Sequence, residues 1–485
     1  MKQIIKVVFS RLFIVSILIL IQAIILGIGI WKLSEYFVYL YVLFAVVSII
    51  VVIYILNKKG NPSYKLAWVI PILLFPVFGG LFYLVFGGDK TGKKFKDSIR
   101  KIYENTKGLL SQNEEIVEEL KDEDKNIANQ FIYTKDYSMF PVYKNTETKY
   151  LSPGENFFDR LQEELKKAKH FIFMEYFIVE EGIMWDTILD ILIEKVKEGV
   201  EVRVMYDDAG TIQTLPYKYY EKLECLGIKT VVFNEIRPRL SLKMNNRDHR
   251  KITVIDGWVG FTGGINLADE YINEKERFGH WKDASIMIKG EAVKNLTLMF
   301  LQVWNFDKNE QEDYKKYLEC SYEGENIKTD GYVQPYADSP LDEETVGENV
   351  YLNIIQKAKE YVYINTPYLI IDNELVTALT LAAKSGLDIR IVTPHVPDKW
   401  YVHLLTRAYY QQLIEAGVKI YEYKPGFIHS KTFVADDEMG VVGSINLDYR
   451  SLYLHFECGI LMYKSKAVLE IKEDFLKTLE DRKST

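Results

Sequence analysis

Cysteine is scarce in this chain, with 3 residues among 485, and the three lie far apart without a Cys-x-x-Cys pair. Neither a disulfide framework nor a zinc site is therefore indicated. The chain also lacks a basic excess, because its formal net charge is -8. A protein that binds long nucleic acid through its phosphates usually has such an excess, which argues against a nuclease. Apolar residues are abundant at 48%, enough for two or three domains with sizeable cores.

Two uncharged apolar stretches, residues 12–30 and 36–56, have the length that a helix needs to cross about 30 Å of hydrocarbon. A cleaved signal peptide fits less well, because the first stretch is long and a second follows at once. Basic residues precede the first stretch and follow the second, whereas Lys32 is the one basic residue between them. These features predict a transmembrane hairpin with both ends in the cytoplasm.

A third apolar stretch, residues 66–86, contains two prolines and is followed by a cluster of lysines. Crossing would place these lysines outside, so a re-entrant or interfacial segment is predicted instead. The membrane region is thus predicted to cover residues 1–88. The charged segment 89–134 has a weak helical period and is predicted to be a juxtamembrane connector.

The remaining chain repeats one order of segments twice. Alternating strand and helix periodicities predict an α/β fold with a parallel or mixed sheet. Gly199 precedes a predicted strand in the first half, and Gly386 precedes its counterpart in the second. We expect two duplicated subdomains, residues 135–325 and 326–485, that pack with pseudo-twofold symmetry.

The pattern His-x-Lys-x4-Asp-x6-Gly-x-x-Asn occurs once in each predicted half with identical spacing. One copy comprises His249, Lys251, Asp256, Gly263 and Asn266, and the other comprises His429, Lys431, Asp436, Gly443 and Asn446. An isolated His-x-Lys is usually structural, but five positions repeated at equal spacing indicate a function. Pseudo-twofold packing would bring the copies face to face and form one site from two halves.

These residue types suit phosphoryl chemistry. One neutral imidazole can attack phosphorus while a second, protonated imidazole gives a proton to the departing oxygen. The lysines and asparagines can donate to phosphate oxygens, and no metal or other cofactor is predicted. The predicted supporting residues are Asp256 and Asp436 for the lysines or the strand ends, Gly264 and Ser444 for close backbone approach, and Asp283 and Glu457 as partners of the histidines.

The other five histidines lack this repetition and are interpreted as structural or peripheral. They are His170, His280, His395, His403 and His455.

The repeated pattern resembles the HKD motif of the phospholipase D superfamily, and the apolar N-terminus makes the chain similar to bacterial cardiolipin synthases. This resemblance implies transfer of a phosphatidyl group between two phosphatidylglycerol molecules through a phosphohistidine. It implies His249 as the nucleophile and His429 as the general acid and then base. The implied partners are phosphatidylglycerol and the bilayer but not nucleic acid, and the implied location is the cytoplasmic membrane, with the catalytic halves facing the cytoplasm.

Three positions depart from the pattern expected for that family: Asp248 and His455 stand where an asparagine is usual, and Lys282 replaces an arginine. The motif itself leaves the acceptor open. A hydrolytic phospholipase D would share the motif, as would a transferase that uses phosphatidylethanolamine or serine. The oligomeric state has no signature in the sequence.

Overall fold

The computed structural model describes residues 20, 24, 27–28, 37–58, 61–75, 79–80, 83, 93–236, 246–308, 312–319, 327, 331–341, 344–480 and 482–484. The chain forms two compact units. The N-terminal unit comprises Met1–Asp97 and Glu235–Asn245, and the large unit comprises Ser98–Asn234 and Asn246–Thr485. Each unit is described by itself.

In the N-terminal unit, α3 (Phe37–Asn57) packs against α4 (Pro62–Leu74). Their shared core includes Ile55 of α3 and Ile72 of α4. The predicted helix over residues 36–56 is therefore present. No helix within the described ranges qualifies by length and apolar character as a membrane span. The first predicted span lies largely outside the described residues, whereas the third apolar stretch begins within α4 and is described over residues 66–75, 79–80 and 83.

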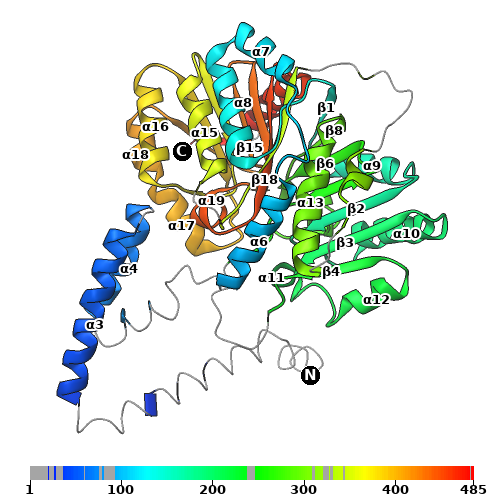
Figure 1. The fold of residues 1–485 in the computed structure, drawn as a ribbon. Helices are drawn as coiled ribbons and strands as arrows, with labels where there is room; N and C mark the ends of the chain where they lie inside the picture. The colour runs from blue at the N-terminus through cyan, green and yellow to red at the C-terminus, as the bar shows by residue number, and fades with distance from the viewer. Residues whose placement is uncertain are drawn as a thin grey trace. The chain divides into compact units, whose positions relative to one another are not determined.

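The first sheet of the large unit has seven strands in the order β1-β8-β6-β5-β2-β3-β4 (Figure 1). Strands β2, β3 and β4 are parallel, and the other neighbours are antiparallel. The bounds are β1 (Thr146–Leu151), β2 (Phe171–Tyr176), β3 (Glu201–Asp207), β4 (Lys229–Phe233), β5 (Ile252–Ile255), β6 (Val259–Gly263) and β8 (Ser285–Gly290).

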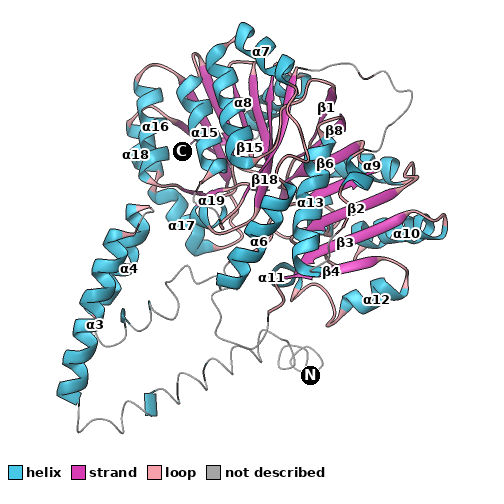
Figure 2. Ribbon diagram, viewed as in Figure 1, coloured by secondary structure: helices cyan, strands magenta, loops and turns pink. Residues whose placement is uncertain are grey.

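The second sheet repeats this order in the strands β9-β18-β16-β15-β10-β12-β13, and β19 extends it at the edge. Figure 2 shows the strands in magenta and the helices in cyan, with β15 and β18 labelled in this sheet. The pairing directions are the same, which confirms the predicted duplication of a mixed α/β sheet. The bounds are β9 (Tyr332–Asp338), β10 (Tyr361–Asn365), β12 (Asp388–Pro394), β13 (Lys419–Tyr423), β15 (Thr432–Ala435), β16 (Met439–Gly443), β18 (Glu457–Tyr463) and β19 (Arg482–Ser484).

Helices cover both sheets because their apolar stripes bury against the β-strands. In the first half these helices are α9 (Gly154–Leu165), α10 (Ile183–Lys197), α12 (Tyr219–Cys225) and α13 (Val293–Lys308). Their counterparts are α15 (Val346–Lys357), α16 (Asn373–Lys384), α18 (Tyr410–Glu415) and α20 (Lys466–Glu480). Shorter elements are α11 (Asp208–Thr211), η3 (Asp269–Ile272), α14 (Lys315–Leu318), α17 (Trp400–Ala408) and α19 (Tyr449–Tyr453).

The charged segment predicted as a connector contains α6 (Lys93–Thr106), α7 (Glu114–Glu123) and the start of α8 (Lys125–Ser138). Leu120 of α7 and Phe131 of α8 are buried in the core of the second half. Much of this segment therefore belongs to the large unit. The predicted domain boundaries stay predictions.

The two halves meet through short strands beside the repeated motifs. β7 (His280–Lys282) of the first half pairs in parallel with β14 (Gly426–Ile428) of the second. The related bridge joins Asp248 to Phe456. Because of these pairings, the backbone next to each motif histidine is held by the opposite half.

Candidate active site

Each motif histidine is bonded to an acid from the opposite half. His249 Nδ1 lies 2.9 Å from Glu457 Oε1, and His429 Nδ1 lies 2.7 Å from Asp283 Oδ2. The backbone repeats the exchange, because His249 N donates to Phe456 O at 3.0 Å and His429 N donates to Lys282 O at 2.7 Å. Neither half therefore contains a complete histidine–acid pair.

Burial sets the protonation state of the two histidines. It lowers the pKa of His249 to about 3 and the pKa of His429 to about 4, although the neighbouring acids oppose this effect. Burial alone would raise the pKa of Glu457 and of Asp283, but the bonded histidine together with other neighbours, His455 for Glu457 and Lys431 for Asp283, holds both pKa values below the ordinary range. At neutral pH each Nδ1–H thus donates to a carboxylate, and each Nε2 keeps its lone pair.

The motif lysines are buried beside the histidines. Lys251 Nζ and Lys431 Nζ each donate to the carbonyl oxygen of the histidine two residues earlier. Burial lowers the pKa of Lys251 to about 8 and that of Lys431 to about 7, while Asp283 and Glu457 act in the opposite direction. Two lysines thus face two carboxylates, and an incoming phosphate anion would favour the charged lysines.

Within the described residues, the hydrogen bonds of both motif aspartates come from backbone N–H groups and not from the motif lysines. Asp256 accepts from three consecutive N–H groups before and at the start of β2, those of Lys169, His170 and Phe171. Asp436 does the same for Lys359, Glu360 and Tyr361 at β10. The sequence predicts that these aspartates support either the lysines or the strand ends, and the observed contacts are at the strand ends. Asp256 and Asp436 position the site from outside it.

Gly264 and Ser444 occupy equivalent places but support the acids differently. A Cβ atom on Gly264 would lie 2.2 Å from Asp283 Oδ1, so glycine leaves the space that this carboxylate needs. Ser444 instead donates from Oγ to Glu457 Oε2 at 2.5 Å, and Ser451 Oγ donates to Oε1 of the same carboxylate. The carboxylates of Asp283 and Glu457 thus occupy the space beside Gly264 and Ser444, where the sequence predicts close approach of the backbone to a ligand.

The two motif asparagines also differ. Asn266 uses both ends of its amide within the protein, since Oδ1 accepts from Ile178 N at 3.0 Å and Nδ2 donates to Tyr271 Oη at 2.7 Å. Asn446 Oδ1 is buried and has no hydrogen-bond partner among the described residues. The predicted phosphate-binding role is therefore better supported for Asn446 than for Asn266.

His455, which the sequence places among the peripheral histidines, lies inside the site. Its Nδ1 is 3.7 Å from Glu457 Oε1, and its ring centroid is 5.5 Å from that of His249. Both ring nitrogens are buried without a hydrogen-bond partner in the described part of the chain. The departure from the family's usual asparagine was the sequence signal for this residue.

His249, His455 and Glu457 offer ligand atoms that all lie within 4.8 Å of one another, so their geometry could hold a metal ion. Glu457 already accepts from His249, Ser444 and Ser451. The absence of a catalytic metal therefore stays a prediction, tested below.

The other two departures lie beneath the site. Lys282 Nζ pairs with Asp474 Oδ1 at 2.7 Å. Asp248 accepts from Arg250 Nε at 3.1 Å, and Arg250 Nη2 lies 2.5 Å from Glu175 Oε1. The first pair joins β7 to α20, and the second group joins the start of the first motif to β2.

The sequence model of the family described as "Cardiolipin synthase, PLD-like domain" matches residues 161–304 and 351–479, which hold one motif each. This chain belongs to that family. A second model, described as "Phospholipase_D-nuclease N-terminal", matches residues 46–88. The two matches together cover both motif-bearing halves and part of the apolar N-terminus.

Several relatives carry the name cardiolipin synthase, and two of them illustrate the match. The cardiolipin synthase of Alkalihalophilus pseudofirmus is 37% identical over 444 residues, which are 90% of this chain and 87% of the relative. The cardiolipin synthase 2 of Bacillus anthracis is 36% identical, over 90% of this chain and 85% of the relative. The family's members so named are phosphatidyltransferases of the phospholipase D superfamily.

The crystal structure of phosphatidylserine synthase from Haemophilus influenzae has the same fold, with a TM-score of 0.52 and 15% identity. The likeness covers 70% of this chain and 87% of that one. At this identity the likeness shows the fold of the two halves and nothing more.

Proposed function

We propose that this chain synthesises cardiolipin by moving a phosphatidyl group from one phosphatidylglycerol to a second, with release of glycerol. One observation carries the proposal: two buried, neutral histidines, each bonded at Nδ1 to an acid of the opposite half. Family membership supplies the substrate class. The arrangement supports a two-step displacement with one histidine for each role.

In the first step, His249 Nε2 attacks the phosphorus of the donor lipid. The N–P bond forms, the bond from phosphorus to the glycerol oxygen breaks, and a protonated His429 gives its proton to that oxygen. Lys251 and Lys431 neutralise the non-bridging oxygens, where negative charge persists through the transition state. The bound phosphate anion also raises the pKa of His429 above its value in the free protein.

In the second step, a hydroxyl of the second phosphatidylglycerol attacks the phosphohistidine. His429 takes the proton of that hydroxyl, the O–P bond forms and the N–P bond to His249 breaks. The cycle returns both histidines to their starting states. No electron or external reagent is needed.

The support around each acid favours this assignment of roles. Two serine hydroxyls donate to Glu457 and spread its charge, so Glu457 stabilises a protonated His249 less strongly. Among the residues that the structure describes, no hydroxyl donates to Asp283 in the same way, and the backbone N–H of Ala284 donates to it at 2.7 Å. His429 is therefore the better proton carrier, and His249 more readily keeps the neutral form that a nucleophile needs.

We also propose that the apolar N-terminal region holds the protein at the cytoplasmic membrane, with the large unit on the cytoplasmic side. Large apolar side chains are exposed on α3 and α4, including Leu43, Ile50 and Leu73. Exposed apolar surface of this extent is covered by lipid in membrane-attached proteins. Attachment would concentrate the lipid acceptor relative to water, which favours transfer over hydrolysis.

The decisive experiment incubates the purified full-length protein with labelled phosphatidylglycerol as the sole lipid. Cardiolipin and glycerol in equal amounts support the proposal. Phosphatidic acid without cardiolipin would instead show a hydrolytic phospholipase D. Added phosphatidylethanolamine or serine tests the other acceptors, and incorporation of either in preference to phosphatidylglycerol would contradict the proposed specificity.

A further inference from the structure

Helix α17 presents an apolar face to the surface of the large unit. Its nine residues begin at Trp400, which is 72% exposed. Tyr401, Leu404 and Leu405 are also exposed, at 52%, 58% and 53%. The spacing i, i+1, i+4, i+5 places these four side chains on one face of the helix. Scattered apolar residues are ordinary on a surface, but a contiguous face of four large ones marks a binding surface.

The helix itself is firmly held on its opposite side. Thr406 is buried, and its Oγ1 accepts from Leu369 N of β11 (Leu369–Ile370) at 3.2 Å. The carboxylate of Asp398, just before the helix, accepts from Tyr368 Oη at 2.6 Å. The apolar face is thus a built part of the fold and not a frayed end.

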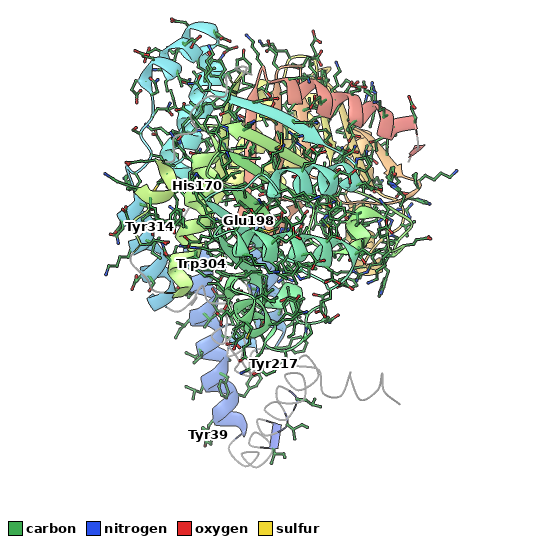
Figure 3. The ribbon with its side chains drawn as sticks, turned by 90° about the vertical axis from the view of Figure 1, so that its right-hand side faces the viewer. Tyr39, His170, Glu198, Tyr217, Trp304 and Tyr314 are labelled. Carbon is green, nitrogen blue, oxygen red and sulfur yellow. The ribbon has the colours of Figure 1, made fainter. Side chains whose placement is uncertain are left out.

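This face lies next to the candidate active site. Strand β11 pairs with β17 (Leu447–Asp448), which directly follows Asn446 of the second motif. Figure 1 shows α17 and α19 at the same end of the large unit. The helix also occupies the connection after parallel strand β12, and such connections border the ligand site in open α/β sheets. The equivalent connection after β3 carries Tyr217, which is 67% exposed and labelled in Figure 3.

Charge selects the partner of this face. Lys399 and Arg407 flank it, and both side chains are more than half exposed although each lies beside a less exposed acid, Asp398 at 3.9 Å and Glu422 at 3.6 Å. The stretch from Lys399 to Gln412 contains no acidic residue. Tryptophan and tyrosine beside leucines, with basic residues at the edge, match the boundary between lipid headgroups and acyl chains, and basic residues favour an anionic leaflet. A helix of about 13 Å is too short to cross a bilayer but can lie in its surface.

We propose that α17 docks the large unit on the surface of an anionic bilayer and so places the active site where its lipid substrates lie. The inference rests on the proposed function for the identity of those substrates. It goes beyond that function by assigning a second lipid contact, separate from α3 and α4. Docking through α17 would let a lipid headgroup enter the site while its acyl chains stay in the bilayer.

The test compares the full-length protein with the double variant Leu404→Gln/Leu405→Gln. Each is reconstituted in vesicles of phosphatidylglycerol and phosphatidylcholine, and each is also assayed on short-chain phosphatidylglycerol dispersed as monomers. We expect the double variant to be about tenfold slower on vesicles, because two leucines lose their lipid contact. Its rate on monomeric substrate should equal that of the parent.

The matched control is Leu469→Gln/Leu476→Gln on α20, where both leucines are exposed, at 52% and 39%. This control should keep the parental rate on vesicles. Equal vesicle rates for the parent and the α17 variant would overturn the docking proposal. A parent that forms no cardiolipin in either assay would instead overturn the proposed function.

Tryptophan fluorescence gives a measurement that does not depend on activity. Brominated acyl chains quench a tryptophan that lies within the bilayer, so the parent should lose more emission than a Trp400→Phe variant in the same vesicles. Equal quenching of both proteins would contradict insertion of α17. If the α17 variant instead loses an oligomeric state while quenching is equal, the face binds a second copy of this chain and the bilayer proposal is wrong.

Discussion

The surroundings of the two catalytic candidates, His249 and His429, show how one arrangement is built in two ways. Around His429, a short Asp283 fits because Gly264 has no side chain. Around His249, the longer Glu457 fits because Ser444 donates a hydrogen bond to it. The duplicated halves therefore kept the histidine–acid geometry while the electrostatic support of each acid diverged. That difference gives the two histidines unequal basicity, which a division of labour requires.

The largest effect should come from removing either histidine. His249→Ala and His429→Ala should each lower turnover by about 10⁴-fold or more, because residues that act as a unit fail together. Product formation from labelled phosphatidylglycerol measures the loss. Trapping of the phosphatidyl group on the protein distinguishes the two roles, because the labelled group should accumulate on the His429→Ala variant. Label on the His249 variant would reverse the assigned roles.

Removing the charge of either acid should have the next largest effect. Glu457→Gln and Asp283→Asn keep the shape of the side chains, but each amide can donate to Nδ1 and so stabilise the wrong tautomer. A loss of about 10²- to 10⁴-fold in kcat is expected, by analogy with carboxylates that orient catalytic histidines. Folding should be retained, as thermal unfolding would show. Near-parental kcat for both variants would contradict a role for the acids in orienting the histidines.

Converting one half's support into the other's tests the divergence directly. Ser444→Gly should cost about 1–3 kcal/mol of unfolding free energy, because Glu457 loses a buried charge-assisted hydrogen bond. Adding Glu457→Asp makes the second half match the first. The double variant should therefore be more stable than the sum of the single changes predicts. If the unfolding free energies of the two single changes simply add in denaturant unfolding, then the pair of Gly264 and Asp283 cannot replace the pair of Ser444 and Glu457.

The lysines and the histidines should give different pH responses, the lysines in kcat/KM at high pH and the histidines in unfolding free energy at low pH. The pKa values of Lys431 and Lys251 are lowered to about 7 and about 8, so kcat/KM should fall as pH rises through this range. The pKa values of His249 and His429 are lowered from 6.5 to about 3 and about 4. Between pH 6.5 and pH 4 the unfolded chain therefore binds more protons, and the unfolding free energy should fall as pH falls. A stability that rises in this acidic range would contradict buried neutral histidines.

The smallest effect should come from His455. His455→Asn restores the residue expected in the family and should change kcat by less than about tenfold, because His455 contacts Glu457 at 3.7 Å without bonding to it. A chelator should leave the activity of the parent unchanged. A metal held by His249, His455 and Glu457 would be shown by three results together: a chelator abolishes activity, a divalent ion restores it, and the ion restores none in the His455→Asn variant.

The sequence predicts the centre of the molecule better than its connections. Equal spacing in two copies was enough to predict the duplicated sheets and the meeting of two motifs, because strand order and spacing are local properties. The exchange of acids depends on the crossing of β7 with β14 and of Asp248 with Phe456, which are long-range pairings without a local pattern. For the same reason the weak helical period of the segment that holds α7 and the start of α8 gave no sign that Leu120 and Phe131 enter the core.

The exchange of acids also predicts how mutations should sort genetically. His249 and Glu457 are 208 residues apart, and His429 and Asp283 are 146 apart. Lesions should therefore group by pair and not by half, so that a change at Glu457 resembles one at His249 more than one at Asp283. Because each pair spans both halves, a change that disables the motif of one half should also disable the acid or histidine that the other half contributes.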